Sequence, residues 1–362
     1  MGLQEPSPQA TDAGVAIRTG SGTVDREPAA APLTERILSR LPGPRIAWMI
    51  AWALVPWLNL AVVLASGATE RGQTGIPVAE VLNRTAVSFA VLLSLRGAAR
   101  ITDELPAVQL VLAKVVEQRQ PHVRQFFRGI DSTLVPLLLT AATVIVLPVD
   151  EALAGEPGAA LIQSATWLVL GIPLWTAVWV YLMVQVGLNR LGRGRLRLEA
   201  YRGDRSLGLR PVGKLAFTGF WMLFGSVGPL VLTASSDRPA VVVGSLVLIA
   251  GLALFFLSLR RLNRQMVALK QHELERALDL YRQAYEPVRN EPTLQMLQHQ
   301  VGALSAAEAL EKRAERIQQW PFDEATFAQV VTIATSVAAG IIGRLILAPV
   351  GLRVANSIGG MH

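Results

Sequence analysis

Long uninterrupted apolar runs dominate the pattern of hydrophobic and polar positions along the chain. A helix needs about 20 mostly apolar residues to cross the hydrocarbon core of a bilayer. Six runs meet or approach this length, and the first five contain no charged residue. The pattern therefore predicts membrane-spanning helices at residues 46–66, 132–149, 164–188, 215–234, 239–259 and 325–348.

A seventh run, at residues 77–95, is less uniform because Glu80 and Arg84 lie in its first two turns. Their spacing of four places both side chains on one helix face, where they can form an ion pair. The next apolar run, residues 105–116, has about 12 residues and is too short to span a bilayer. It predicts a separate helix lying in the membrane interface.

The distribution of basic residues predicts the orientation of these spans. Residues 189–214 contain eight basic and two acidic residues, whereas residues 150–163 contain three acidic residues and no basic one. Because basic loops stay in the cytoplasm, the first loop should lie inside and the second outside. Residues 96–131 are also basic. With this segment and the N-terminus both cytoplasmic, residues 77–95 must cross, which gives seven spans and an external C-terminus.

A model with six spans remains open. In it, residues 77–95 lie in the interface and the N-terminus is external. In the seven-span model, residues 1–40 form a disordered cytoplasmic N-terminus and residues 41–259 form the bundle of the first six spans. Residues 321–350 contain the last span, and residues 351–362 form a C-terminal tail.

Residues 260–320 predict a cytoplasmic helical hairpin between the last two spans. Its first helix carries one apolar stripe, formed by Leu274, Leu278, Tyr281 and Tyr285. The two prolines within residues 287–292 predict the turn, after which a second helix runs from about residue 293 to 319. A capping-box pattern from Ser305 to Glu308 leaves open that this second helix restarts at Ser305.

Composition agrees with an all-α polytopic membrane protein. The 362 residues are 51% hydrophobic and 17% charged, whereas soluble domains have about 25% charged residues. The net charge is +7, but the basic residues flank apolar runs, so they predict contact with the lipid bilayer and not with nucleic acid. The abundance of arginine and alanine favours a bacterial plasma (inner) membrane.

Two short segments carry a resemblance to known proteins. One is the loop YRGDRSLGLRPVG at residues 201–213, and the other is WPFD at residues 320–323, directly before the last span. Both are similar to segments of uncharacterised bacterial multi-pass membrane proteins. The resemblance implies a membrane architecture and no functional site.

The last span contains the most unusual pattern of small and polar residues. Its small side chains recur every four positions in two adjacent rows, which let helices approach closely in lipid. One interpretation is that this face lines a polar path or an oligomer axis, and the other is tight packing against another span of the same chain. The residues of this face are Gln329, Thr332, Thr335, Ser336, Ala339, Gly340 and Gly343.

Other candidates for chemistry are few. Glu80 and Arg84 form either a structural ion pair or a proton or ion site, since carboxylates within membranes are costly and often functional. The sequence has no cysteine and no phosphate-binding, metalloprotease or serine-hydrolase motif. We therefore expect no enzyme activity, cofactor or metal.

Permeation is the leading functional hypothesis. The protein would be a homo-oligomeric channel or channel-like transporter for a small solute or ion. The alternative is a membrane-anchored sensor or scaffold in which residues 260–320 bind a cytoplasmic protein.

Overall fold

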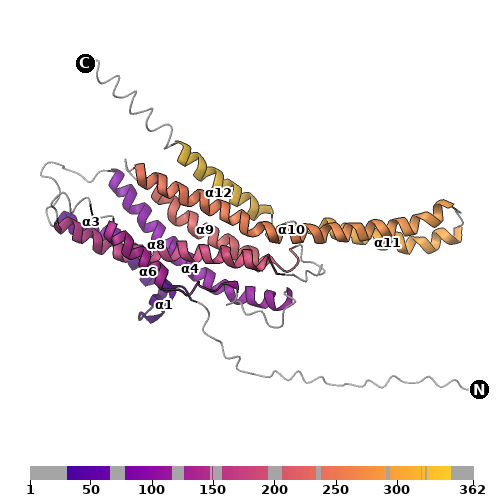
Figure 1. Ribbon diagram of the computed structural model, residues 1–362, viewed down its shortest axis with the longest axis horizontal. Coiled ribbons are helices and arrows are strands. Elements are labelled where there is room, and N and C mark those ends of the chain that lie inside the picture. Colours follow the sequence, from indigo (N-terminus) through magenta and orange to yellow (C-terminus); the bar gives the residue numbers. More distant parts are fainter. Residues whose placement is uncertain are drawn as a thin grey trace, which may run out of the picture.

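The computed structural model describes residues 31–65, 78–115, 126–146, 149, 157–194, 206–233, 238–290, 294–318, 320–322 and 324–343. These residues form helices joined by turns, with no strand among them (Figure 1). The predicted disorder of residues 1–30, the tail 351–362, residues 150–156 and the loop 195–205 lie outside the described residues. The helices are α1 (Leu33–Arg40), α2 (Arg45–Ala53), α3 (Val55–Ala65), α4 (Val78–Val115), α6 (Leu134–Val146), α8 (Pro157–Leu191), α9 (Arg210–Thr233), α10 (Arg238–Asn290), α11 (Leu294–Glu315) and α12 (Glu324–Ile342).

Several of these helices are long and apolar enough to cross a membrane. Four qualify alone, namely α4, α8, α9 and α10. A fifth span is possible if α2 and α3 are counted together, because they are bent by 42° at a short break. The described apolar parts of α6 and α12 are shorter. The predicted all-helical membrane class is thus confirmed, and the count of seven spans stays a prediction.

The bend between α2 and α3 has a local cause. Pro56 is the second residue of α3, where its missing backbone N–H is tolerated. The same missing N–H removes the hydrogen bond that would continue α2 into α3, so the predicted span 46–66 breaks at Leu54.

The N-terminal boundary differs from the prediction. The last eight residues of the segment expected to be disordered, residues 33–40, form α1 instead. Leu33 and Leu38 on this helix are buried, so the helix packs on the bundle through its apolar side chains. The sequence did not reveal this because two buried leucines in eight residues are a weak signal.

The prediction of a separate interfacial helix at residues 105–116 is wrong. A single helix, α4, contains both this run and the run at 77–95, and Pro106 lies within it without ending it. Leu105, Val108 and Leu112 recur at helical spacing and are buried in the main core. Their burial against Phe127 and Ile130 holds this half of α4 on the bundle.

Helix α10 has 53 residues, about 80 Å at the usual helical rise, which is far more than a bilayer requires. Its second half leaves the bundle and pairs with α11 to form the predicted hairpin (Figure 1). It continues past Pro287 and ends at Asn290, so the turn begins later than predicted. Helix α11 is unbroken at Ser305, which argues against the alternative restart.

The pairing face of the hairpin includes only part of the predicted leucine–tyrosine stripe, since Tyr281 donates a hydrogen bond to Oε2 of Glu311 on α11 at 3.0 Å. Leu278 and Tyr285 are 52% and 62% exposed. Four alanines are buried between the helices instead, because small side chains let the helix axes approach closely. Their spacing is seven residues on each helix, and they are Ala277, Ala284, Ala307 and Ala314. Lys270 of α10 fixes the base of the hairpin by donating hydrogen bonds to the carbonyls of Glu315 and Ile317.

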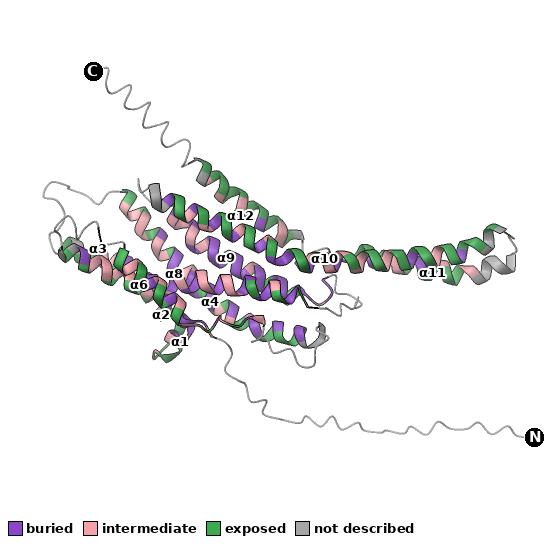
Figure 2. Cartoon of the chain, in the orientation of Figure 1, coloured by how far each residue is buried: buried purple, intermediate pink, exposed green. Residues whose placement is uncertain are grey.

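Helix α9 forms the centre of the bundle, and most of its faces are buried (Figure 2). It runs antiparallel to α4 in a tight seam. A Cβ atom added at Gly97 of α4 would lie 2.4 Å from Cγ of Met222, and one added at Gly225 of α9 would lie 2.6 Å from Cδ1 of Leu93. Each glycine thus receives a side chain from the opposite helix, and Ser94 donates a hydrogen bond to Ser226 between them.

We predict that Gly97→Ala destabilises the bundle by about 1–3 kcal/mol, since overpacking of a tight contact costs this much. The added methyl would also meet Cβ of Met222, at 2.7 Å, so a change of rotamer cannot relieve the clash. The melting temperature of the purified protein in detergent measures the effect.

Gly228→Ala on α9 is the control, because no atom lies within 4 Å of the added Cβ. It should be neutral or slightly stabilising, since alanine favours helix. Equal melting temperatures for Gly97→Ala and Gly228→Ala would contradict the tight seam.

Candidate functional site

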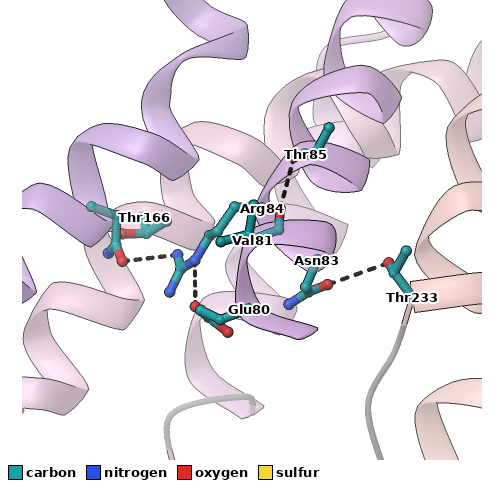
Figure 3. A network of polar contacts seen from close by, with 8 residues as sticks. Glu80, Val81, Asn83, Arg84, Thr85, Thr166 and Thr233 are labelled. Atoms are coloured by element: carbon teal, nitrogen blue, oxygen red, sulfur yellow. Dashed lines mark hydrogen bonds and ion pairs between the residues drawn. The ribbon is translucent and has the colours of Figure 1, made fainter. Parts of the chain in front are cut away.

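A polar cluster joins α3, α4 and α8 (Figure 3). These parts of α3 and α4 lie at the end of the bundle opposite the hairpin (Figure 1). Nε of Arg84 donates a hydrogen bond to Oε1 of Glu80 at 2.6 Å, so the ion pair that the sequence spacing allows is formed. Nη1 of Arg84 also donates to Oδ1 of Asn59 on α3, at 2.9 Å. The amide of Asn59 in turn donates to the hydroxyl of Thr166 on α8.

Within this cluster, the charge of Arg84 is paired with that of Glu80, and Asn59 both accepts and donates a hydrogen bond. The side chains of Arg84 and Glu80 are 23% and 34% exposed, so the pair is sheltered without being sealed from the outside. Such a network fixes the relative positions of three helices. The sequence revealed Glu80 and Arg84 but not Asn59 and Thr166. Asn59 lies 25 positions before Arg84, and Thr166 lies 107 positions after Asn59. Asn59, the single amide side chain in residues 46–66, was the available signal.

Polar contacts recur along the seam between α4 and α9. Close to the cluster, Thr233 donates to Asn83 at 3.5 Å. About ten residues further along α4 is the contact between Ser94 and Ser226, at 2.8 Å. At the hairpin end, Glu104 accepts from Thr218 and forms an ion pair with Lys214, both at 3.2 Å. We infer that these contacts hold the register of the two helices.

Helix α12 presents the predicted small-residue face away from the bundle. Its opposite, aliphatic face packs on the core through Phe327, Val330, Ile333 and Val337. Gly340 packs on α9, where an added Cβ would lie 2.8 Å from Cδ2 of Leu232, and Gly343 has no atom within 4 Å of its added Cβ. The other five residues of the predicted face are exposed: Gln329, Thr332, Thr335, Ser336 and Ala339.

An aromatic cluster anchors the start of α12. Trp320 stacks on Phe322 and Phe327, with ring centroids 5.7 Å and 5.9 Å away. Phe322 in turn stacks on Phe255 of α10. The carbonyl oxygen of Pro321 would be only 2.0 Å from a Cβ at Gly213, so the backbone lies directly on the start of α9. The WPFD segment therefore contacts the end of the 201–213 loop, which no pattern in the sequence had predicted.

One buried carboxylate escaped the sequence analysis. Glu35 on α1 is 2% exposed and forms an ion pair with Arg45 of α2. Burial raises the pKa of Glu35 above its usual value, while Arg45 lowers this pKa and nearby Asp103 of α4 raises it. The folded protein therefore binds the Glu35 proton more tightly than the unfolded chain does.

The described residues include no group of three His, Cys, Asp or Glu side chains placed to hold a metal ion. The chain matches no protein-family model, no curated protein and no solved structure. A functional assignment must therefore rest on the geometry of these sites.

We predict that Arg84→Met lowers the stability of the protein by about 1–3 kcal/mol, because it leaves Glu80 and Asn59 with unpaired polar groups. Thr85→Ala is the control, since the Thr85 side chain is exposed and bonds only its own helix, at Val81. Thermal unfolding in detergent compares the two. A cluster with no structural role would give equal melting temperatures.

We also predict that Glu35→Gln raises the melting temperature at pH 8. A carboxyl group whose pKa is raised by folding adds stability below its unfolded pKa, and this contribution is lost as the pH rises through the folded pKa. Above that value the buried charge opposes folding, and glutamine removes it. The gain should therefore shrink towards pH 4.

Glu275→Gln on the exposed surface of the hairpin is the matched control and should show no such pH dependence. If Glu35→Gln instead destabilised the protein more at pH 8 than at pH 4, the ion pair with Arg45 would outweigh the cost of burial.

Proposed function

We propose that the protein is an oligomeric channel or channel-like transporter for a small solute or ion, with the exposed face of α12 along the path. The observation that carries the proposal is the orientation of α12. Its aliphatic face is used on α9 and the core, so its hydroxyl and amide side chains point outward.

This orientation is costly in a lipid environment. The amide of Gln329 exposed to hydrocarbon would have no hydrogen-bond partner, and polar groups buried without partners are expensive. The cost disappears if the face borders water or packs on the same face of another copy of the chain. Small side chains also allow close approach of helices in lipid. A homo-oligomer with a polar path at its axis satisfies both conditions.

The contacts between α12 and α9 support a membrane-crossing α12. Pro321 lies on Gly213 and Gly340 lies on Leu232, a separation of 108 positions in both cases. The two helices therefore run parallel and in step over 19 residues, about 28 Å. Helix α9 is itself long and apolar enough to cross a membrane. Helix α12 then crosses the same thickness.

The orientation within the membrane follows from charge. The positive-inside rule puts the hairpin and the N-terminus in the cytoplasm and the C-terminus outside, which fits a bacterial plasma membrane. Seven spans complete this topology.

A second function is favoured by the hairpin. It projects from the bundle and leaves Leu278, Tyr285 and Val301 exposed, at 52%, 62% and 59%. Exposed apolar side chains on a projecting helical pair suit the capture of an amphipathic helix from a protein partner. The protein would then act as a membrane-anchored sensor or scaffold.

We predict that Gln329→Leu and Ser336→Leu each change the flux of ions through the purified protein in liposomes, without unfolding it. Val331→Leu is the matched control, because Val331 is exposed on the aliphatic flank of the same helix. Gly340→Leu should lower stability through its clash with Leu232 and does not report on the path.

Flux equal to wild type in both Gln329→Leu and Ser336→Leu would exclude this face from the path. If the wild-type protein gives no flux under gradients of Na⁺, K⁺, Cl⁻ or H⁺, the sensor or scaffold function is the better one.

A further inference from the structure

One side of the α4–α9 seam carries a row of residues from each helix. Arg96, Arg100 and Glu104 follow one another at intervals of four on α4. Lys214, Trp221 and Gly225 follow at intervals of seven and four on α9. Residues at these intervals share a helix face.

Contacts at both ends bring the two rows to the same side of the seam. Glu104 forms an ion pair with Lys214, and Leu93, about one turn before Arg96 and two before Arg100, packs on Gly225. Because the helices are antiparallel, Arg100 and Trp221 lie between these two contacts. Arginine and tryptophan therefore border the seam at the same height.

These side chains are open to the surroundings. Arg96 and Arg100 are exposed, the side chain of Lys214 is 69% exposed, and Trp221 is 42% exposed. Among the described residues, neither Arg96 nor Arg100 has an ion pair with an acid. Glu104 is engaged by Lys214 and Thr218. Asp103 lies three residues after Arg100. It is close to Glu35 of α1, where its charge raises the pKa of Glu35.

The depth of this surface matches a lipid headgroup. Arg100 is 20 residues from Glu80, about 30 Å along α4, which is the thickness of the hydrocarbon core. With the Glu80–Arg84 pair at one interface, Arg96 and Arg100 lie at the other, on the side of the hairpin. Phe89, seven residues before Arg96, is 51% exposed and lies where an acyl chain would run.

We propose that this surface binds the headgroup of an anionic phospholipid in the leaflet on the hairpin side. The guanidinium groups of Arg96 and Arg100 and the ammonium of Lys214 would contact the phosphate, since basic groups between spans at this level suit anionic headgroups. The Trp221 ring occupies the interfacial depth that tryptophan prefers. Phe89 covers the first part of an acyl chain. The proposal does not depend on permeation.

The test is binding of phosphatidylglycerol to the full-length protein in detergent micelles, followed by native mass spectrometry and by the shift in melting temperature. The double variant Arg96→Gln/Arg100→Gln should bind phosphatidylglycerol about 30-fold more weakly, because each basic residue near an anionic surface contributes a factor of about five. Binding of zwitterionic phosphatidylcholine should be unchanged.

The matched control is Arg276→Gln/Arg282→Gln, which removes the same charge from exposed arginines of the hairpin. It should retain wild-type binding of phosphatidylglycerol. All four arginines are exposed, and equal elution volumes and melting temperatures without lipid confirm folding. Equal affinity of the wild-type protein and the Arg96→Gln/Arg100→Gln variant, or an equal loss in the hairpin control, would overturn the proposal. Displacement of phosphatidylglycerol by millimolar inorganic phosphate would also overturn it, because the ligand would then be a free anion.

Discussion

The insertion of side chains into glycine notches is the interaction on which the rest of the bundle depends. In lipid there is no hydrophobic drive between helices, so stability must come from close packing. Helix α9 receives or supplies such a contact with α4, α10 and α12. The pairs are Gly97 with Met222, Gly225 with Leu93, Gly244 with Val231, Gly251 with Leu223, Gly213 with Pro321 and Gly340 with Leu232. The arrangement explains why α9 is the most buried of the four long apolar helices.

Two of these contacts determine how α12 is presented. Gly213 accepts the backbone at Pro321, and Gly340 accepts Leu232, so α12 is held on α9 at both ends. The stacked rings of Trp320, Phe322 and Phe327 fix its first turns against α10. Because the aliphatic face of α12 packs on the core, the hydroxyl and amide side chains on the opposite face point outward. Their exposure follows from the packing of α9.

The sequence predicted what depends on composition over 20 or more residues. The long apolar runs, the ion pair between Glu80 and Arg84 and the existence of the hairpin all have local signals. It did not predict what depends on partners far along the chain. The apolar stripe at Leu278 suggested one pairing face, but burial of Ala277 and Ala284 decides the hairpin, because axis separation counts for more than side-chain size there.

The same limit applies to helix ends and to candidate sites. The apolar run 105–116 looked like an independent short helix because nothing local says that Leu105 and Leu112 join the main core. Asn59, Thr166 and Glu104 were missed because their roles arise from contacts between helices. The outward orientation of Gln329 also required the structure. The sequence places Gln329 on the small-residue face of α12 but does not show which face of α12 packs on the bundle.

Depth separates the two outward-facing polar surfaces and decides what can cover each. Arg96 and Arg100 lie near one end of the 30 Å span measured from Glu80, where long side chains reach phosphates and water. Ser336 lies 15 residues beyond Pro321, about 22 Å along a helix that runs in step with α9. The hydroxyl of Thr332, about 16 Å along, donates to the carbonyl of Ala328 in its own helix. The amide of Gln329, about 12 Å along, has no partner among the described residues. No headgroup reaches that depth. The arginines can be satisfied by lipid alone, whereas the amide of Gln329 needs water or another protein surface. That difference is the physical basis for our proposal that the α12 face borders a contact between copies of the chain or a polar path.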